Sequence, residues 1–271
     1  MDIAKCTIDG KTYLAVNFAK LPTDELTEKR RNLVCTSCGS DAYFRKESKS
    51  GQAACFGATP HNEECELAAP DSNREEGELD IEDIQNNPGQ VIEIDLNFGA
   101  TPKTNIDINP DDNVSGTQGK GRHVGQGTRP NAHSHRRLSS LLRNLIRSKD
   151  FRNSKQIICI EEVTYSVKDF FVKFSGVVKK YVNEFQGYWG VLADAQLDND
   201  GNLWLNSGGR SSVSVLIESE LVQSFYQRFK LEDEESLSGA SILVLGTMYI
   251  SGRGKKFIKP NGLDYLTVKK V

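Results

Sequence analysis

The sequence predicts a mostly β protein with two folded parts: a small cysteine-rich module at the N-terminus and, at the C-terminus, a basic helix followed by a five-stranded β-barrel. Three observations predict this. Four of the six cysteines lie between positions 35 and 65, the next stretch is charged and poor in apolar residues, and short alternating runs fill the chain from 157 onward. We therefore expect a module over 1–69, an acidic and then glycine-rich linker, partly disordered, over 70–130, and the helix and barrel over 131–271.

The composition is that of an ordinary globular protein. Of the 271 residues, 37% are hydrophobic and 26% are charged. No run approaches the roughly 18 apolar residues that a membrane span needs. The first residues, Met1 to Cys6, lack the charged start and apolar stretch of a secretory signal. We expect a cytoplasmic protein that makes no membrane contact and keeps its cysteines reduced.

The cysteine cluster has the spacing of a metal site. Two thiolates separated by two residues, Cys35 and Cys38, can bind one tetrahedral ion, and Cys55, His61 and Cys65 raise the candidates to five for four positions. Because His61 and Cys65 can meet one ion from a single helical turn, Cys35, Cys38, His61 and Cys65 are the preferred set, and Cys55 replaces His61 if the site is all thiolate. We expect a structural Zn²⁺. Buried free cysteines or a redox pair remain open, although the pair does not open a helix in a βαβ pattern.

The same segment resembles the zinc-finger domains of competence-protein-like bacterial DNA-processing proteins over about its first 70 residues. The resemblance depends on Cys35-x-x-Cys38-Gly39, on Tyr43-Phe44-Arg45, and on Cys55-Phe56 followed by His61 and Cys65. It departs from those domains at Cys55, where they usually carry histidine. The resemblance implies a role in DNA processing.

The two signs of charge are segregated along the chain, although the formal net charge is only −3. Acidic residues dominate from 63 to 112, where the alternating run Val91 to Leu96 predicts one strand. Basic residues dominate from 120 to 155. A polyanion can therefore bind locally despite the net charge.

The helix expected over 136–147 carries an apolar stripe and a basic side. Leucines and Ile146 recur at helical spacing from Leu138, and the other side carries Arg136, Arg143 and Arg147. One interpretation is a solvated basic side over a stripe packed on the core. The other is that the arginines contact phosphates, which the neighbouring His133 and His135 favour.

The C-terminal strands are expected at 170–182, 188–195, 203–206 with its continuation at 213–217, 240–250, and 256–259 with 263–268, with a helix over 219–229 after the third. The turn Asn199 to Asn202 predicts a hairpin. This order resembles the OB-fold. The resemblance implies a barrel that binds oligonucleotides or oligosaccharides on strands two and three, between the loops after strands one and four.

Single-stranded nucleic acid needs cations for its phosphates and flat rings for its bases. The candidates are Lys173, Lys179, Tyr181, Trp189, Trp204, Arg210, Arg253, Lys255, Lys256 and Phe257. Each ring could instead be a core residue, since either Tyr188 or Trp189 must point inward. The glycine-flanked basic loop is the stronger indication, because barrel stability does not require its three cations together.

Three functions remain open. Non-enzymatic binding of nucleic acid, above all single-stranded DNA, explains most of the features. A protein-interaction or regulatory subunit of a bacterial DNA-processing or phage-defence assembly, docking through the Leu138 to Ile146 helix, is the alternative. A metal-dependent nuclease using Asp95, Glu161 and Glu162 is disfavoured because no catalytic motif accompanies these carboxylates.

Overall fold

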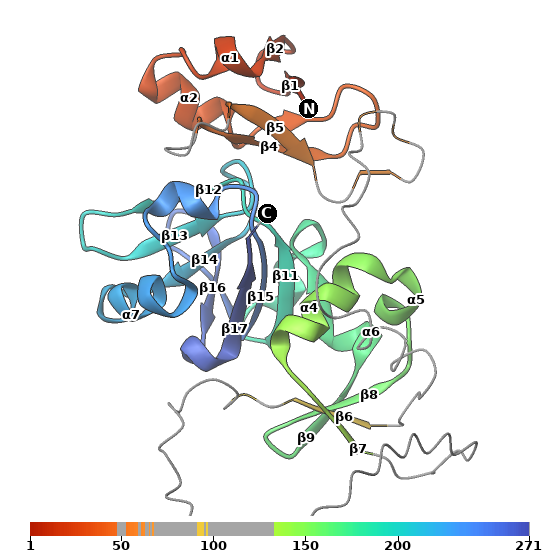
Figure 1. Cartoon of the computed structure of the whole chain (residues 1–271). Coiled ribbons are helices and arrows are strands. Elements are labelled where there is room, and N and C mark those ends of the chain that lie inside the picture. The colour runs from red at the N-terminus through yellow and green to blue at the C-terminus, as the bar shows by residue number, and fades with distance from the viewer. Residues whose placement is uncertain are drawn as a thin grey trace, which may run out of the picture.

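The computed structural model describes residues 1–47, 53–58, 61, 62, 65, 67, 91–94, 96 and 133–270. In these residues the protein is mostly β, with three sheets and short helices (Figure 1). Apart from β6 (Val91–Ile94) and Leu96, the linker expected over 70–130 lies outside the described residues, as does Asp95. Within the described part no helix is both long and apolar enough to cross a membrane.

The N-terminal module is a five-stranded sheet in the order β2-β1-β3-β4-β5. Its first two strands form a hairpin, in which Ile3 pairs with Leu14 across the turn at Gly10. Three phenylalanines, Phe18, Phe44 and Phe56, pack with ring centroids 4.9 to 5.5 Å apart in its core. The elements are β1 (Ile3–Cys6), β2 (Thr12–Leu14), α1 (Ala15–Phe18), α2 (Thr23–Lys29), β3 (Leu33–Val34), β4 (Asp41–Arg45) and β5 (Cys55–Ala58).

A second sheet, β7-β6-β8-β9, was not foreseen as a unit; beside β6 it contains β7 (His133–Arg136), β8 (Ile157–Ile160) and β9 (Val163–Ser166). The expected helix is α4 (Leu138–Arg147), followed by α5 (Lys149–Arg152). The leucines of α4 are buried against this sheet and against Trp189, Leu243 and Leu245 of the large sheet. The apolar side of α4 is therefore core, and it does not offer the exposed docking surface that the sequence suggested for a protein partner.

The large sheet has eight strands and is not closed into a five-stranded barrel, which corrects the sequence prediction. Its strand order is β10-β11-β15-β16-β14-β13-β12, and β17 pairs with β15. The elements are α6 (Val167–Phe170), β10 (Phe171–Lys173), the 3-10 helices η1 (Phe174–Gly176) and η2 (Lys179–Tyr181), β11 (Phe185–Val191), β12 (Asp194–Leu197), β13 (Leu203–Asn206), β14 (Ser214–Ile217), α7 (Ser219–Phe229), η3 (Glu234–Leu237), β15 (Ser241–Ile250), β16 (Lys256–Pro260), η4 (Leu263–Tyr265) and β17 (Leu266–Lys269).

Two of the strands expected from the sequence are wrong. The run 170–182 breaks into the end of α6, β10 and two 3-10 turns, because its apolar residues can be buried from turns as well as from a strand. The run 188–195 begins earlier and divides at Leu192, so that β11 pairs with β15 while β12 pairs with β13. The hairpin at Asn199 to Asn202 is confirmed, with Gly201 in the left-handed region and Trp204 opposite Gln196.

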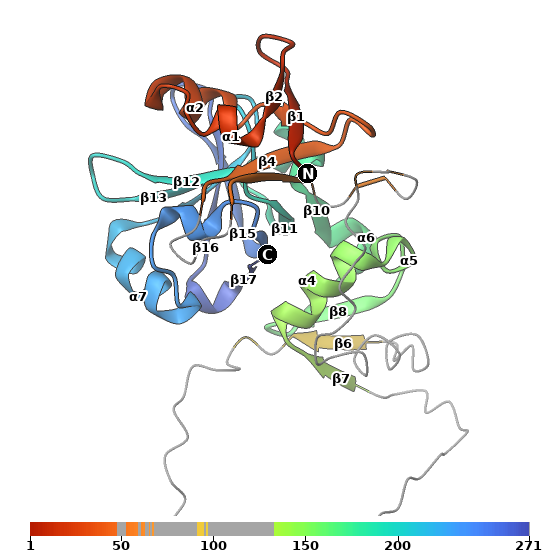
Figure 2. The same ribbon diagram turned by 45° about the horizontal axis from the view of Figure 1, so that its top comes forward.

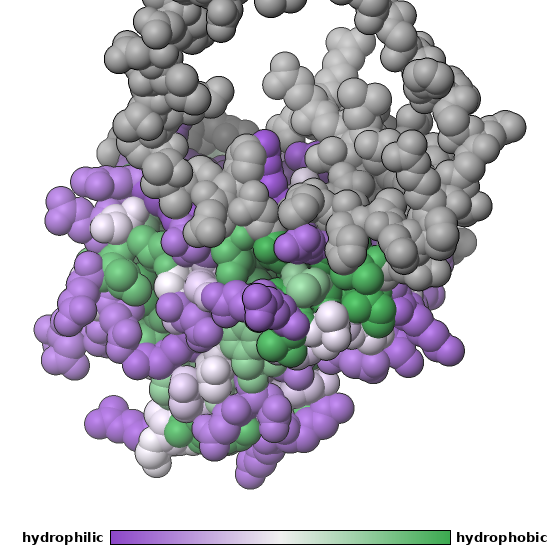
Figure 3. All heavy atoms as spheres, turned by 90° about the horizontal axis from the view of Figure 1, so that it is seen from below, coloured by the Kyte–Doolittle hydropathy of each residue, from purple (hydrophilic) through white to green (hydrophobic). Residues whose placement is uncertain are grey.

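The core of the large sheet lies on the side covered by α7, where Phe225 is fully buried among the inward residues of β13, β14 and β15. On the face viewed in Figure 3, apolar side chains are interspersed with polar ones. The N-terminal module lies over β12 and β13 in both ribbon views (Figure 2).

Candidate metal centre and nucleic-acid interface

Cys35, Cys38, His61 and Cys65 form one compact group, as the preferred set predicts. One donor atom from each lies within 4.8 Å of all the others. The turn that follows β3 holds the first pair, since Gly39 donates its amide to the Cys35 carbonyl and has a φ of +69°. Cys55, the reserve candidate, is in β5 and does not belong to the group.

The donor spacing fits a tetrahedral ion. The Cys35 and Cys65 sulfurs are 3.8 Å apart, and the Cys38 sulfur is 3.4 Å from His61 Nδ1. A tetrahedron with Zn–S of about 2.3 Å and Zn–N of about 2.0 Å has S···S edges of about 3.8 Å and S···N edges of about 3.5 Å. These two separations therefore match the edges of such a tetrahedron, and the remaining donor atoms also lie within 4.8 Å of one another.

The two thiols of the first pair have opposite surroundings. The pKa of Cys38 is lowered to about 5, first by the Ser40 hydroxyl and then by the amide of Asn62, both of which favour the thiolate. Burial raises the pKa of Cys35. Cys38 is thus the thiol of the pair whose surroundings favour the thiolate.

Three aromatic side chains form a surface on the side of the large sheet that faces away from the core. Trp204 of β13 meets Phe257 of β16 with ring centroids 5.7 Å apart, and Phe257 meets Tyr249 of β15 at 5.6 Å. All three are half-buried, whereas their strand neighbours Leu203, Leu205 and Ile258 are fully buried. The Trp204 indole donates to Asp198 Oδ2 at 2.8 Å, which fixes the ring plane.

Two loops that carry cations lead into β14 and β16 where Ser214 pairs with Phe257. Arg210 and Arg253 are exposed, in the loops that connect β13 to β14 and β15 to β16. The Lys255 ammonium donates to the Ser212 carbonyl at 2.9 Å and so joins the two loops, while Lys256 donates to the Val177 carbonyl at 3.0 Å. The sequence suggested free cations at both lysines, but their ammonium groups are already engaged.

The remaining predicted contacts lie elsewhere. Trp189 is 4% exposed and packs beside α4, with Lys173 and Arg152 over its ring at 5.9 and 5.8 Å. Tyr181 packs edge-on against Tyr188, and Lys179 is exposed in η2 next to it. Trp189 is therefore a core residue, whereas Lys179 and Tyr181 belong to a segment that joins β15 through a bridge between Val182 and Met248.

The arginines of the basic helix are also separate from it. Arg147 is exposed and Arg143 is half-buried on α4, which packs beside the β6–β9 sheet. The Arg136 side chain lies outside the described residues, although its backbone belongs to β7.

Sequence reasoning missed Tyr249. It lies in the alternating run of β15, where Met248 is buried and Tyr249 pairs with Phe257. The alternation alone could have marked it as outward, but the pairing with Phe257 requires the register of the β15–β16 hairpin.

Of the carboxylates considered for catalysis, Asp95 lies outside the described residues, and Glu161 and Glu162 are neighbours in one turn. Glu161 and Glu162 form the two-residue turn between β8 and β9, both with positive φ, and Glu161 accepts a hydrogen bond from the Tyr265 hydroxyl. Among the described residues, only the cysteine–histidine group brings three or more potential metal ligands together.

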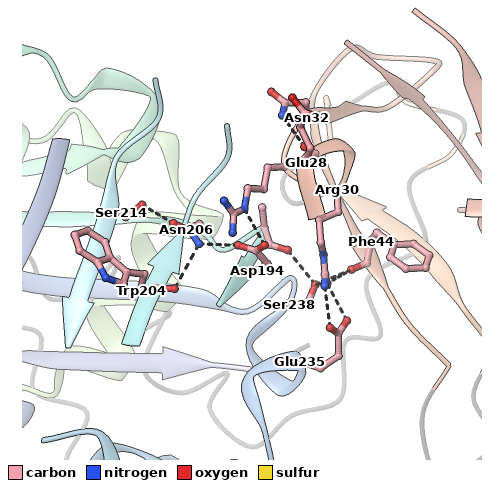
Figure 4. A network of polar contacts seen from close by, with 12 residues as sticks. Glu28, Arg30, Asn32, Phe44, Asp194, Trp204, Asn206, Ser214, Glu235 and Ser238 are labelled. Carbon is pink, nitrogen blue, oxygen red and sulfur yellow. Dashed lines mark hydrogen bonds and ion pairs between the residues drawn. The ribbon is translucent and has the colours of Figure 1, made fainter. Parts of the chain in front are cut away.

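The N-terminal module is held on the large sheet by two consecutive arginines (Figure 4). Arg30 makes a bidentate pair with Glu235, at 2.9 and 2.8 Å, and also donates to the Phe44 carbonyl at 3.1 Å. Arg31 Nε donates to Asp194 Oδ2 at 2.8 Å, and Asp194 is 2% exposed. Glycines allow the close approach, since a Cβ at Gly209 would overlap Asn32.

Comparisons with known proteins add little to this geometry. No protein-family model matches the chain. No curated protein matches it either. Among solved structures, it is similar to a putative aspartyl-tRNA synthetase from Leishmania major Friedlin, at 10% identity and a TM-score of 0.25, over 41% of this chain and 22% of that one. This chain thus spans about a fifth of that protein, and a likeness so low carries no argument about fold or function.

Proposed function

We propose that this protein binds single-stranded nucleic acid, in the first place DNA, on the surface formed by Trp204, Phe257 and Tyr249, and that it does so without catalysis. The observation that carries the proposal is the row of three half-buried rings beside two loops bearing Arg210 and Arg253. Rings of this kind stack on bases at roughly 1 to 3 kcal/mol per base, and the cations suit the phosphates. Stacking tolerates any base, so we expect weak sequence preference.

The strand order supports an OB-fold-type interpretation of this part of the chain. If β11 and β12 are taken as two halves of one bent first strand, the large sheet has the order β12-β13-β14-β16-β15-β11, with α7 between β14 and β15 in the chain. This order matches the one expected for that fold. In this order the three rings lie on strands two, five and four, because Trp204 is in β13, Phe257 in β16 and Tyr249 in β15. The flanking loops become 198–202 and 251–255, which moves the first of them from the position that the sequence suggested.

The metal centre has a structural role in this proposal, with Zn²⁺ held by Cys35, Cys38, His61 and Cys65. Three thiolates and an imidazole complete a tetrahedron and leave no position for a substrate. In so small a module, the ion would replace part of the core that the chain is too short to build.

The test is fluorescence anisotropy of a short labelled single strand, titrated with wild type and with Phe257→Ala and Tyr249→Ala. We expect each ring substitution to weaken binding about tenfold, within the range for loss of one stacked base. Arg253→Glu should weaken binding and flatten its salt dependence, because a phosphate contact releases counterions. Lys11→Glu, at an exposed lysine in the turn between β1 and β2, is the matched charge control and should leave the affinity unchanged.

Two results would refute the proposal. The surface is wrong if the ring variants fold, as shown by circular dichroism, and bind as wild type does. The non-enzymatic assignment is wrong if the pure protein cuts the strand in Mg²⁺ or Mn²⁺ and loses that activity in Glu161→Gln with Glu162→Gln.

A further inference from the structure

The row of side chains that contains Phe257 and Tyr249 continues under the N-terminal module. Cross-strand pairing places Asp194 opposite Asn206, Asn206 opposite Ser214, Ser214 opposite Phe257, and Phe257 opposite Tyr249. These five residues belong to β12, β13, β14, β16 and β15 in turn. One continuous row is thus polar at one end and aromatic at the other.

The polar end of the row is a chain of hydrogen bonds that ends on a carboxylate. Ser214 donates to Asn206 Oδ1 at 2.7 Å, and Asn206 donates through Nδ2 to Asp194 Oδ1 at 2.8 Å. Figure 4 shows these three residues pointing toward one another from neighbouring strands. Asp194 therefore carries its negative charge on the same side of the sheet as the aromatic surface.

Arg31 is the only ion-pair partner found for Asp194 among the described residues. It reaches Asp194 from the turn between α2 and β3. Lys255 lies within electrostatic reach of both: its pKa is lowered to about 8, first by burial and then by Arg31, whereas Asp194 acts in the opposite direction. Arg31 and Lys255 thus share one carboxylate.

We propose that Arg31, although it belongs to the metal-binding module, sets the affinity of the aromatic surface for nucleic acid by neutralising Asp194 at the end of the same row. This inference rests on the proposed function and names Arg31 as a positioning residue, not as a phosphate contact. Without Arg31, one of two changes follows at the Asp194 carboxylate, and each weakens the binding of a polyanion. It remains unpaired and repels phosphates, or it draws the Lys255 ammonium away from the loop.

Arg30 provides the matched comparison. It also joins the module to the large sheet, and its partner Glu235 lies in η3, outside the row of Asp194. A loss of docking would follow from breaking either pair. A change in the charge of the binding face follows only from breaking the pair of Arg31 with Asp194.

The experiment is anisotropy at low salt with a labelled single strand of DNA, using the full chain. Arg31→Ala should weaken binding about threefold, the effect of one unpaired unit charge about 10 Å from a phosphate at an effective dielectric constant of about 20 and one Debye length of screening. Arg31→Ala with Asp194→Asn should restore an affinity near that of wild type, and Asp194→Asn alone should bind as tightly or more tightly. Glu235→Gln should leave the affinity unchanged.

The inference is overturned if Arg31→Ala binds as wild type does, or if Asp194→Asn fails to rescue it. It is also overturned if Asp194→Asn alone weakens binding, a readout that stands even where Arg31→Ala does not fold. If the wild-type chain binds and Phe257→Ala weakens that binding, any of these results would leave the proposed function intact. No binding by the wild-type chain would overturn both.

Discussion

Gly239 holds the N-terminal module and the large sheet together by leaving room for a ring. It follows η3 with a φ of +80°, and a Cβ there would overlap the ring of Tyr43 in β4. That ring also covers Gly57, where a Cβ would meet it as well. Tyr43 is 5% exposed and therefore has no free direction in which to move.

Replacing Gly239 with alanine should therefore destabilise the protein through two separable terms. A non-glycine residue in the left-handed region costs about 1 to 2 kcal/mol. Forcing an extra carbon into a packed site costs typically about 1 to 3 kcal/mol more. We expect Gly239→Ala to lower the free energy of unfolding by about 2 to 5 kcal/mol, the sum of these terms.

Gly201→Ala isolates the first term, the conformational cost. Gly201 has the same φ of +80°, but its added Cβ would meet only Ser219, at an ordinary 3.4 Å. We expect this variant to lose only the conformational cost of about 1 to 2 kcal/mol. Urea titrations followed by circular dichroism measure both free energies. Equal losses in the two variants would show that Tyr43 does not pack against Gly239, and would refute the docking described here.

Three further outcomes are expected. Cys65→Ser should abolish the binding of one Zn²⁺ per chain and destabilise the module, whereas Cys55→Ser should retain the ion. Elemental analysis of the purified variants measures the bound metal, and metal loss in Cys55→Ser would contradict the ligand set. The folded-state pKa of Lys255 is about 8, below its ordinary 10.5, so its charge destabilises the fold below pH 8 and the free energy of unfolding should rise between pH 8 and 10.5. Lys255→Met should remove this rise from a pH series of unfolding free energies. An unchanged rise would exclude Lys255 as its source. Leu141→Ala, at a fully buried position of α4, should cost about 2 to 5 kcal/mol in urea, whereas a loss below about 1 kcal/mol would mean that α4 is not core.

Local signals in the sequence predicted the local features correctly. The cysteine and histidine spacing selected the group that the structure brings together, because ligands a few residues apart on tight turns have few ways to be arranged. The turn at Gly201 and the leucine stripe of α4 were foreseen for the same reason. Each depends on backbone preferences and periodicity within one short segment.

Features that depend on distant residues were not predictable. Arg30 and Arg31 read as ordinary surface cations at the end of a helix, and their partners lie 205 and 163 residues away. Trp189 was ambiguous because alternation cannot tell which side of a strand will be covered, and α4 covers its side. The aromatic surface depends likewise on the register between β15 and β16, which no single segment contains.

Cross-linking tests the central claim most directly. A single strand of DNA bound to the full chain is irradiated with ultraviolet light, and the modified peptides are located by mass spectrometry. We predict cross-links at Trp204, Tyr249 and Phe257. Cross-links confined to Tyr181 and the segment from Arg143 to Arg152, with none on β13, β15 or β16, would contradict the account.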